Sequence, residues 1–232
     1  MSETIQVLLA NLPRYLDALW VTLQLVFISG ALGFFLALPV ALARCSRRPL
    51  LRHGSHAFTI FFRGTPLLIQ IFLVYFGSGQ FQPWFEAAGL WPLFREPFFC
   101  ALFALTINTA AYVGEVIAGG IRGIPYGEIE AARAFGLSGR QVARRILFPR
   151  ALRITLPALN NETVILLKSS SLASTITLVD LMGLTREMVS ETFAPFEFFL
   201  VAGAIYFCLI QLTTLAFRGL ERTWVLPEEA RK

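Results

Sequence analysis

The sequence predicts an all-α polytopic membrane bundle of about five transmembrane helices. Hydrophobic residues fill 56% of its 232 positions and charged residues only 15%, and the mean hydropathy is +0.63. Such a composition leaves too little polar surface for a water-soluble domain of this length. Long charge-free runs can each cross a hydrocarbon core about 30 Å thick. These runs lack the alternation of barrel strands, so helices are the remaining way to satisfy every backbone group in lipid.

The first predicted span covers residues 18–43. It is too long for the hydrophobic region of a cleavable signal peptide, lacks a small-residue cleavage site, and has only one base, Arg14, before it. We therefore expect this helix to stay in the mature protein. The second predicted span covers residues 58–79. Gly64 and Pro66 interrupt it directly after Arg63, which predicts a bend that shapes a pathway, with helix-end anchoring by Arg63 as the alternative.

The remaining predicted spans cover residues 97–120, 154–179 and 197–217. In the third span, Ala110, Gly114 and Ala118 form a ridge of small residues suited to close helix packing. The fourth span contains Glu162 and Lys168, which predicts a polar face sheltered by the bundle interior. We detect no tandem repeat and no soluble domain, so residues 1–232 are expected to form a single transmembrane domain.

The distribution of arginines predicts the orientation of the bundle. Residues 44–57 carry four arginines and no acid, and residues 121–155 carry seven arginines against two acids. The connections 78–97 and 180–197 are acidic instead. Because Lys and Arg accumulate in cytoplasmic loops, the N-terminus is expected outside and the C-terminus inside, with Arg231 and Lys232 in the cytoplasm. The net charge of +5 thus reflects topology, and nothing indicates a nucleic-acid partner.

The connection between the third and fourth spans, residues 124–150, predicts two short helices joined at a glycine. Good helix formers fill residues 128–135, and Gly136 suits the left-handed turn that ends a helix. Ser138 and Gln141 stand at the spacing of a capping box, which starts the second helix, and Pro149 is expected to end it. We expect these helices to lie beneath the membrane and to insert into a groove on a partner.

Several kinds of chemistry are excluded by the motifs that the chain lacks. A phosphate loop needs G-x-x-x-x-G-K-[ST], but the two lysines, Lys168 and Lys232, do not occur in that pattern. The chain therefore cannot hydrolyse ATP alone and is expected not to be an enzyme. Its three cysteines are isolated, and His53 and His56 lie in an arginine-rich loop. Neither set predicts a metal site or a disulfide framework.

Residues 127–149 resemble the cytoplasmic loop of the membrane subunits of ATP-binding-cassette importers. That loop reads Glu-Ala-Ala, three residues, Gly, nine residues, Ile, any residue, Leu-Pro, and Phe148 replaces its leucine here. The resemblance implies contact with the ATPase through six residues: Glu130, Ala131, Ala132, Gly136, Ile146 and Pro149. A basic amphipathic loop lying on the inner leaflet is the alternative interpretation.

Further segments are similar to the permeases of the polar amino-acid importers, particularly those for histidine, arginine and opines. They are residues 63–67 (RGTPL), 76–81 (FGSGQF), 108–112 (NTAAY) and 161–172 (NETVILLKSSSL). The resemblance runs from about Tyr15 to Trp224. It implies a multi-pass protein of the bacterial inner membrane that carries basic or polar amino acids by alternating access.

The same resemblance implies the partners of the chain. They are ATP-binding-cassette ATPase subunits, which hold ATP and magnesium, a second identical or homologous permease subunit, and a periplasmic or extracellular amino-acid-binding protein. Membrane lipid surrounds the bundle, and no cofactor is expected in this chain itself. An ATP-independent channel or carrier, and a noncatalytic membrane scaffold, are the alternative functions.

Polar residues inside the spans are the candidates for a substrate pathway, because such groups are costly in lipid and usually face a cavity. For a cationic amino acid, acids would meet the positive groups, and a lysine or hydroxyl would meet the carboxylate. Structural bracing of the loops is the competing role for Glu115 and Glu162. The candidate pathway residues are Thr65, Asn108, Glu115, Glu162, Lys168 and Ser169.

Overall fold

The computed structural model describes residues 7–224, and every regular element in that range is helical. Three helices are long and apolar enough to cross a membrane, and the number rises to five if each of two bent pairs counts as one span. The prediction of an all-α membrane bundle is confirmed. The N-outside orientation stays a prediction, and Arg231 and Lys232, on which it partly relies, lie outside the described residues.

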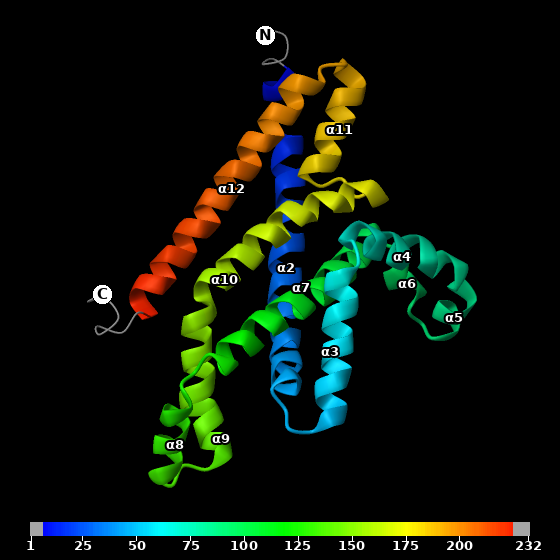
Figure 1. Cartoon of the computed structure of the whole chain (residues 1–232). Helices are drawn as coiled ribbons and strands as arrows, with labels where there is room; N and C mark the ends of the chain where they lie inside the picture. Colours follow the sequence, from blue (N-terminus) through cyan, green and yellow to red (C-terminus); the bar gives the residue numbers. More distant parts are fainter. Residues whose placement is uncertain (1–6, 225–232) are drawn as a thin grey trace.

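The long helix α2 (Leu12–Arg44) forms the central column of the bundle and packs along α7 (Pro97–Arg122) (Figure 1). Small residues permit this close approach. A Cβ on Gly114 would lie 2.8 Å from Val40 of α2, and Ala110 and Ala118 beside it are buried. The predicted small-residue ridge of the third span is therefore a packing surface against α2.

The bend predicted at Gly64 and Pro66 divides the second predicted span into two helices. The chain forms α3 (Pro49–Gly64) and α4 (Leu67–Gln80), which meet at an angle of 97°. Residues 49–57, predicted as a loop, begin α3 because Pro49 fits the first turn of a helix and the basic residues after it are compatible with helical structure. The arginines predict the side of the membrane on which this connection lies, whereas the residue at which α3 begins depends on backbone geometry.

The two acidic connections also contain helices that the hydropathy pattern does not reveal. Short helices α5 (Gln82–Ala87) and α6 (Trp91–Phe94) follow α4. The segment predicted as a loop at 180–197 contains α11 (Leu181–Thr192), which is capped by Asp180, whose carboxylate accepts a hydrogen bond from Gly183 N at 2.9 Å. Helix α12 (Pro195–Trp224) then completes the described chain.

The fourth predicted span is longer and more irregular than the pattern indicates. Helix α9 (Gly139–Val142) runs through a π-helical turn (Ala143–Leu147) into α10 (Phe148–Ser169), which ends in the 3₁₀ helix η2 (Ser170–Ile176). The expectation that Pro149 ends the second loop helix is wrong. Pro149 lies in the first turn of α10, directly after the wider π turn, a kind of turn that often interrupts helices.

The turn between α2 and α3 lies at the same end of the bundle as α8 (Tyr126–Ala134) and α9, and α11 lies at the opposite end (Figure 1). The two arginine-rich connections therefore share one end, which agrees with the charge pattern. The buried core joins α2, α4, α7 and α10 through Leu25, Ile71, Leu105 and Leu167. This core positions the break between α3 and α4 against α7 and α10.

Candidate functional sites

The break between α3 and α4 exposes backbone carbonyls, and neighbouring side chains supply their hydrogen bonds. In a continuous helix the Phe62 oxygen would accept from residue 66, but Pro66 has no N–H. Gln70 Nε2 donates to this oxygen at 2.9 Å and Asn108 Nδ2 at 3.2 Å. Tyr112 Oη donates to the Arg63 oxygen at 3.3 Å. The bend that Gly64 and Pro66 predict is therefore present, and side chains of α7 stabilise it.

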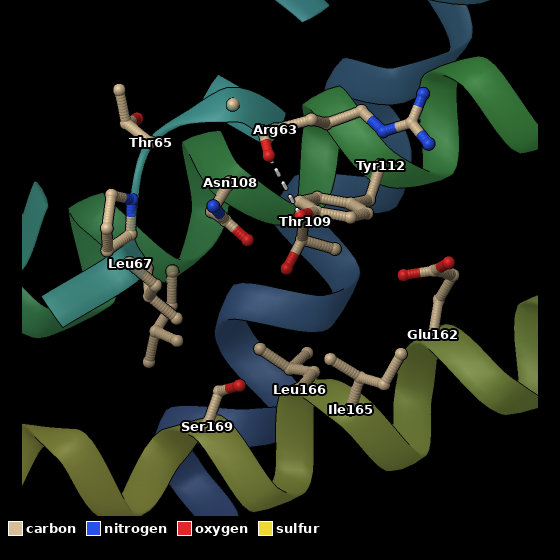
Figure 2. A pocket seen from close by; sticks show the side chains of 13 residues that line it. Arg63, Thr65, Leu67, Asn108, Thr109, Tyr112, Glu162, Ile165, Leu166 and Ser169 are labelled. Carbon is tan, nitrogen blue, oxygen red and sulfur yellow. Dashed lines mark hydrogen bonds between the residues drawn. The ribbon is translucent and has the colours of Figure 1, made fainter. Parts of the chain in front are cut away.

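A cavity of about 400 Å³ lies between this break, α7 and α10. Figure 2 shows Glu162 and Ser169 projecting from α10 toward Asn108, Thr109 and Tyr112 on α7. Four predicted pathway residues line the cavity: Thr65, Asn108, Glu162 and Ser169. The structure thus brings together residues from three separate parts of the chain.

Glu162 is the acid of this cavity. Its side chain is half-buried, and it forms no hydrogen bond or ion pair with any other residue in the range 7–224. Carboxylates within membrane helices usually face an interior cavity or a partner charge. The alternative role for Glu162, a brace on the cytoplasmic loop, has no supporting contact in the described chain. Its carboxylate is open to a ligand.

Glu115 has the opposite environment, because two arginines hold it. Arg44 Nε lies 2.6 Å from Glu115 Oε2, the second Arg44 contact is 3.1 Å, and Arg122 lies 2.7 Å from Oε1. Such a forked contact between guanidinium and carboxylate fixes geometry as well as charge. Glu115 therefore braces the ends of α2 and α7, and it is absent from the residues that line the Glu162 cavity.

Lys168 also lies away from the cavity, although its neighbours on α10 line it. Its side chain is exposed, and residues 165, 166 and 169 form the cavity wall instead. The helical spacing explains this, since Lys168 is six residues from Glu162 and therefore points in a different direction. Lys168 therefore does not supply the donor that was predicted for the substrate carboxylate in this cavity.

Arg63 and Tyr112 line the cavity but were not among the predicted pathway residues. The Arg63 guanidinium carbon lies 5.1 Å from the centre of the Tyr112 ring, a cation–π distance. Arg63 forms no ion pair with any residue that the structure describes. The position of Tyr112 four residues after Asn108, on one helix face, was the signal that could have identified it.

A second cavity of about 430 Å³ adjoins the first. Arg63, Gly64 and Tyr112 line both cavities, so the two cavities meet at these residues. The second cavity extends from there toward the α2–α3 turn and is also lined by Arg44, His56, Thr59, Ile60 and Glu115. Within residues 7–224, no group of three or more His, Cys, Asp or Glu side chains could hold a metal ion.

The loop after α7 has the capping chemistry that its sequence predicts. Helix α8 ends in a Schellman motif, with Gly136 N donating to Arg133 O at 2.9 Å and Leu137 N to Ala132 O at 3.2 Å. Gly136 takes the left-handed conformation at φ +79°. The hydroxyl of Ser138 and the side chain of Gln141 then form the capping box of α9.

The predicted coupling residues divide between two structural settings. Glu130, Ala131 and Gly136 are exposed on or beside α8, whereas Ala132 is buried and anchors the helix. Ile146 and Pro149 are half-buried in the stretch that leads from α9 into α10. Phe135 is 88% exposed at the end of α8, which makes it the most prominent apolar side chain of this loop.

A helical membrane bundle that has an internal polar cavity and presents a capped loop helix at one end is the architecture of a transport permease. A protein-family model described as the binding-protein-dependent transport system inner membrane component matches residues 29–225. The chain belongs to this family. It is therefore a component of a membrane transport system and resides in the inner membrane.

Curated relatives and solved structures agree with this assignment. The chain is 48% identical to the nopaline transport system permease protein NocM of Agrobacterium fabrum, over 87% of this chain and 84% of that protein. It is 40% identical to the histidine/lysine/arginine/ornithine transport system permease protein HisM of Salmonella typhimurium, over 88% and 87%. A crystal structure of an amino acid ABC transporter with histidines matches at a TM-score of 0.82 and 31% identity, over 94% of this chain and 97% of that one.

Proposed function

We propose that this permease carries amino acids with basic or polar side chains, or opines, through the cavity between the α3–α4 break, α7 and α10. The observation that supports this is the pair of opposite charges on the cavity wall. Glu162 and Arg63 both line it, and neither forms an ion pair with another described residue. An amino acid brings a carboxylate and an ammonium group, so it matches both charges.

The size and lining of the cavity fit an amino acid. Its volume of about 400 Å³ is within the range of small-molecule sites, roughly 300–1,000 Å³. The Glu162 carboxylate would accept from the ammonium group or a cationic side chain. The Arg63 guanidinium would bind the α-carboxylate, and the amide oxygen of Asn108 and the Ser169 hydroxyl supply further polar contacts. The relatives named for nopaline, octopine and histidine/lysine/arginine/ornithine transport support this class of substrate.

Energy for transport comes from partner subunits in this proposal. ATP and magnesium bind to separate ATPases, and the loop 127–149 contacts them through α8. A second permease subunit, identical or homologous, and an amino-acid-binding protein complete the complex. Coupling requires that the loop contact the two ATPase states differently, because only a differential contact can shift a conformational equilibrium.

Transport by the assembled complex in proteoliposomes tests the proposal. With ATP inside the vesicles and the binding protein outside, Glu162→Gln should lower arginine uptake about tenfold, the scale of one partly screened charge pair. Uptake of a neutral substrate should fall less. The exposed Glu86 on α5 gives a matched control, because Glu86→Gln removes an acid that does not line the cavity. Unchanged arginine uptake by Glu162→Gln, or full uptake without ATP, would contradict the proposal.

A further inference from the structure

The two acids near the membrane interior differ in one respect that bears on transport. Glu162 of the first cavity is open, whereas Glu115 of the second cavity is held by Arg44 and Arg122. The Glu115 side chain is 20% exposed and the Arg44 side chain 12%, so this pair is partly shielded from solvent. Partial burial makes the contact stronger than an ordinary surface ion pair.

The position of the second cavity makes it the continuation of the first. The two cavities share Arg63, Gly64 and Tyr112 in their linings, and from these residues the second cavity follows α3 back to His56 and reaches the end of α2 at Arg44. That end of the bundle carries the arginine-rich connections and α8 (Figure 1). A solute that leaves the first cavity toward this end therefore enters the second.

The charges of the second cavity disfavour a cationic solute. Two arginines against one carboxylate leave the Arg44–Glu115–Arg122 cluster with a net positive charge, and Arg63 adds another. Both carboxylate oxygens of Glu115 already accept hydrogen bonds from arginines. A cationic side chain would meet repulsion here and no free acid.

We infer that the second cavity is an exit vestibule, in which Arg44 and Arg122 occupy Glu115 so that a departing cationic amino acid finds no second acidic site. The inference rests on the proposed function, since it assumes a cationic substrate. A cationic amino acid then binds only weakly in the second cavity, on the cytoplasmic side. Release is then fast, and substrate that accumulates in the cytoplasm does not block the pathway.

Product inhibition in proteoliposomes tests the exit vestibule. The vesicle lumen corresponds to the cytoplasm and is loaded with ATP and increasing unlabelled arginine, while uptake of labelled arginine is measured. Arg44→Gln frees part of the Glu115 carboxylate and should make luminal arginine inhibit uptake at a concentration about tenfold lower than in the unaltered complex. Arg122→Gln leaves the forked Arg44 contact intact and should cause a smaller shift.

The double variant Arg44→Gln/Glu115→Gln is the decisive control. It lacks the same arginine but also lacks the acid, so inhibition by luminal arginine should return to the level of the unaltered complex. Equal inhibition in the single and double variants, or an Arg44→Gln complex no more sensitive than the unaltered one, would overturn the inference. Failure of the proposed function has a different signature, because the unaltered complex would then show no ATP-dependent arginine uptake. If the Arg44→Gln complex does not assemble, Arg44→Lys is used in its place. Lysine cannot form the forked contact with Glu115, so inhibition by luminal arginine should shift in the same direction.

Discussion

Asn108 on α7 donates a hydrogen bond of 3.2 Å to the backbone oxygen of Phe62 on α3. This oxygen is the one that Pro66 leaves without a helical donor. The same Asn108 amide donates to Gln70 Oε1 at 3.1 Å, and Gln70 donates in turn to Thr65. A small polar network thus fixes the 97° bend that opens the first cavity.

Asn108→Leu should destabilise the bend, because it removes one donor from the Phe62 oxygen and leaves Gln70 Oε1 unpaired. Loss of a buried hydrogen-bond partner costs about 1–3 kcal/mol. The unfolding temperature of the purified complex should therefore fall. Gln82→Leu serves as the control, since within residues 7–224 the exposed Gln82 side chain bonds only to the nearby Glu86. Equal unfolding temperatures for the two variants would contradict the role of the network.

Helix packing predicts that alanine substitutions at two adjacent glycines of α7 have different effects on stability. A Cβ at Gly120 would contact the Thr155 methyl group and lie 3.0 Å from the Ala151 oxygen, both on α10. Gly120→Ala should therefore push α7 away from α10 and cost about 1–3 kcal/mol. Among the described residues, a Cβ added at Gly119 meets nothing within 4 Å beyond the nearby backbone of its own helix, so Gly119→Ala should be neutral or slightly stabilising. The yield of monodisperse complex in size-exclusion chromatography compares them, and equal yields would refute the packing argument.

The sequence predicts elements whose signals are local. Gly64 and Pro66 predict the break, Gly136 predicts the left-handed turn, and Ser138 with Gln141 predicts the capping box. Each of these signals acts within a few residues, so no knowledge of the packing is needed. Charge-free runs likewise predict the helical bundle, because lipid requires it.

The roles of the two acids could not be predicted in the same way. Glu115 and Glu162 are both acids close to arginines in the sequence, so the pattern left bracing and pathway roles open for each. The deciding partner of Glu115 is Arg44, which lies 71 residues away along the chain. The start of α3 and the whole of α11 were also missed, because hydropathy detects long apolar runs and these segments contain charged and polar residues. Long-range packing determines both features.

The exposed Phe135 at the end of α8 predicts an anchor for the partner ATPase. Aromatic side chains that fill a pocket on a partner often contribute 2 kcal/mol or more to binding, roughly a thirtyfold change in affinity. Phe135→Ala should therefore lower the amount of ATPase that co-purifies with the permease. Phe193 is also 88% exposed but lies in the turn between α11 and α12, at the other end of the bundle. Phe193→Ala should retain the ATPase, and similar losses for both variants would argue against a specific anchor.

The left-handed turn at Gly136 predicts a loss of coupling when a branched residue replaces it. At φ +79° a valine would cost about 1–2 kcal/mol or more, so the chain would leave this conformation and break the Schellman hydrogen bonds that end α8. Helix α8 would then no longer be held at a fixed angle to α9, and movement of the ATPase would not reach α10. Gly136→Val should insert in the membrane normally, yet the ATPase activity of the complex that contains it should no longer rise with substrate.

Gly139→Ala is the matched control for this substitution. It lies three residues away and has no positive φ, and a Cβ added there meets nothing in the described part of the chain within 4 Å beyond the adjacent backbone. In proteoliposomes, the ATPase activity of the Gly139→Ala complex should respond to the substrate-bound binding protein as in the unaltered complex. A substrate-stimulated Gly136→Val complex would show that the turn is not needed for coupling. If Gly139→Ala also lost stimulation, the loop would be sensitive to any added side chain, and the left-handed turn would have no special role.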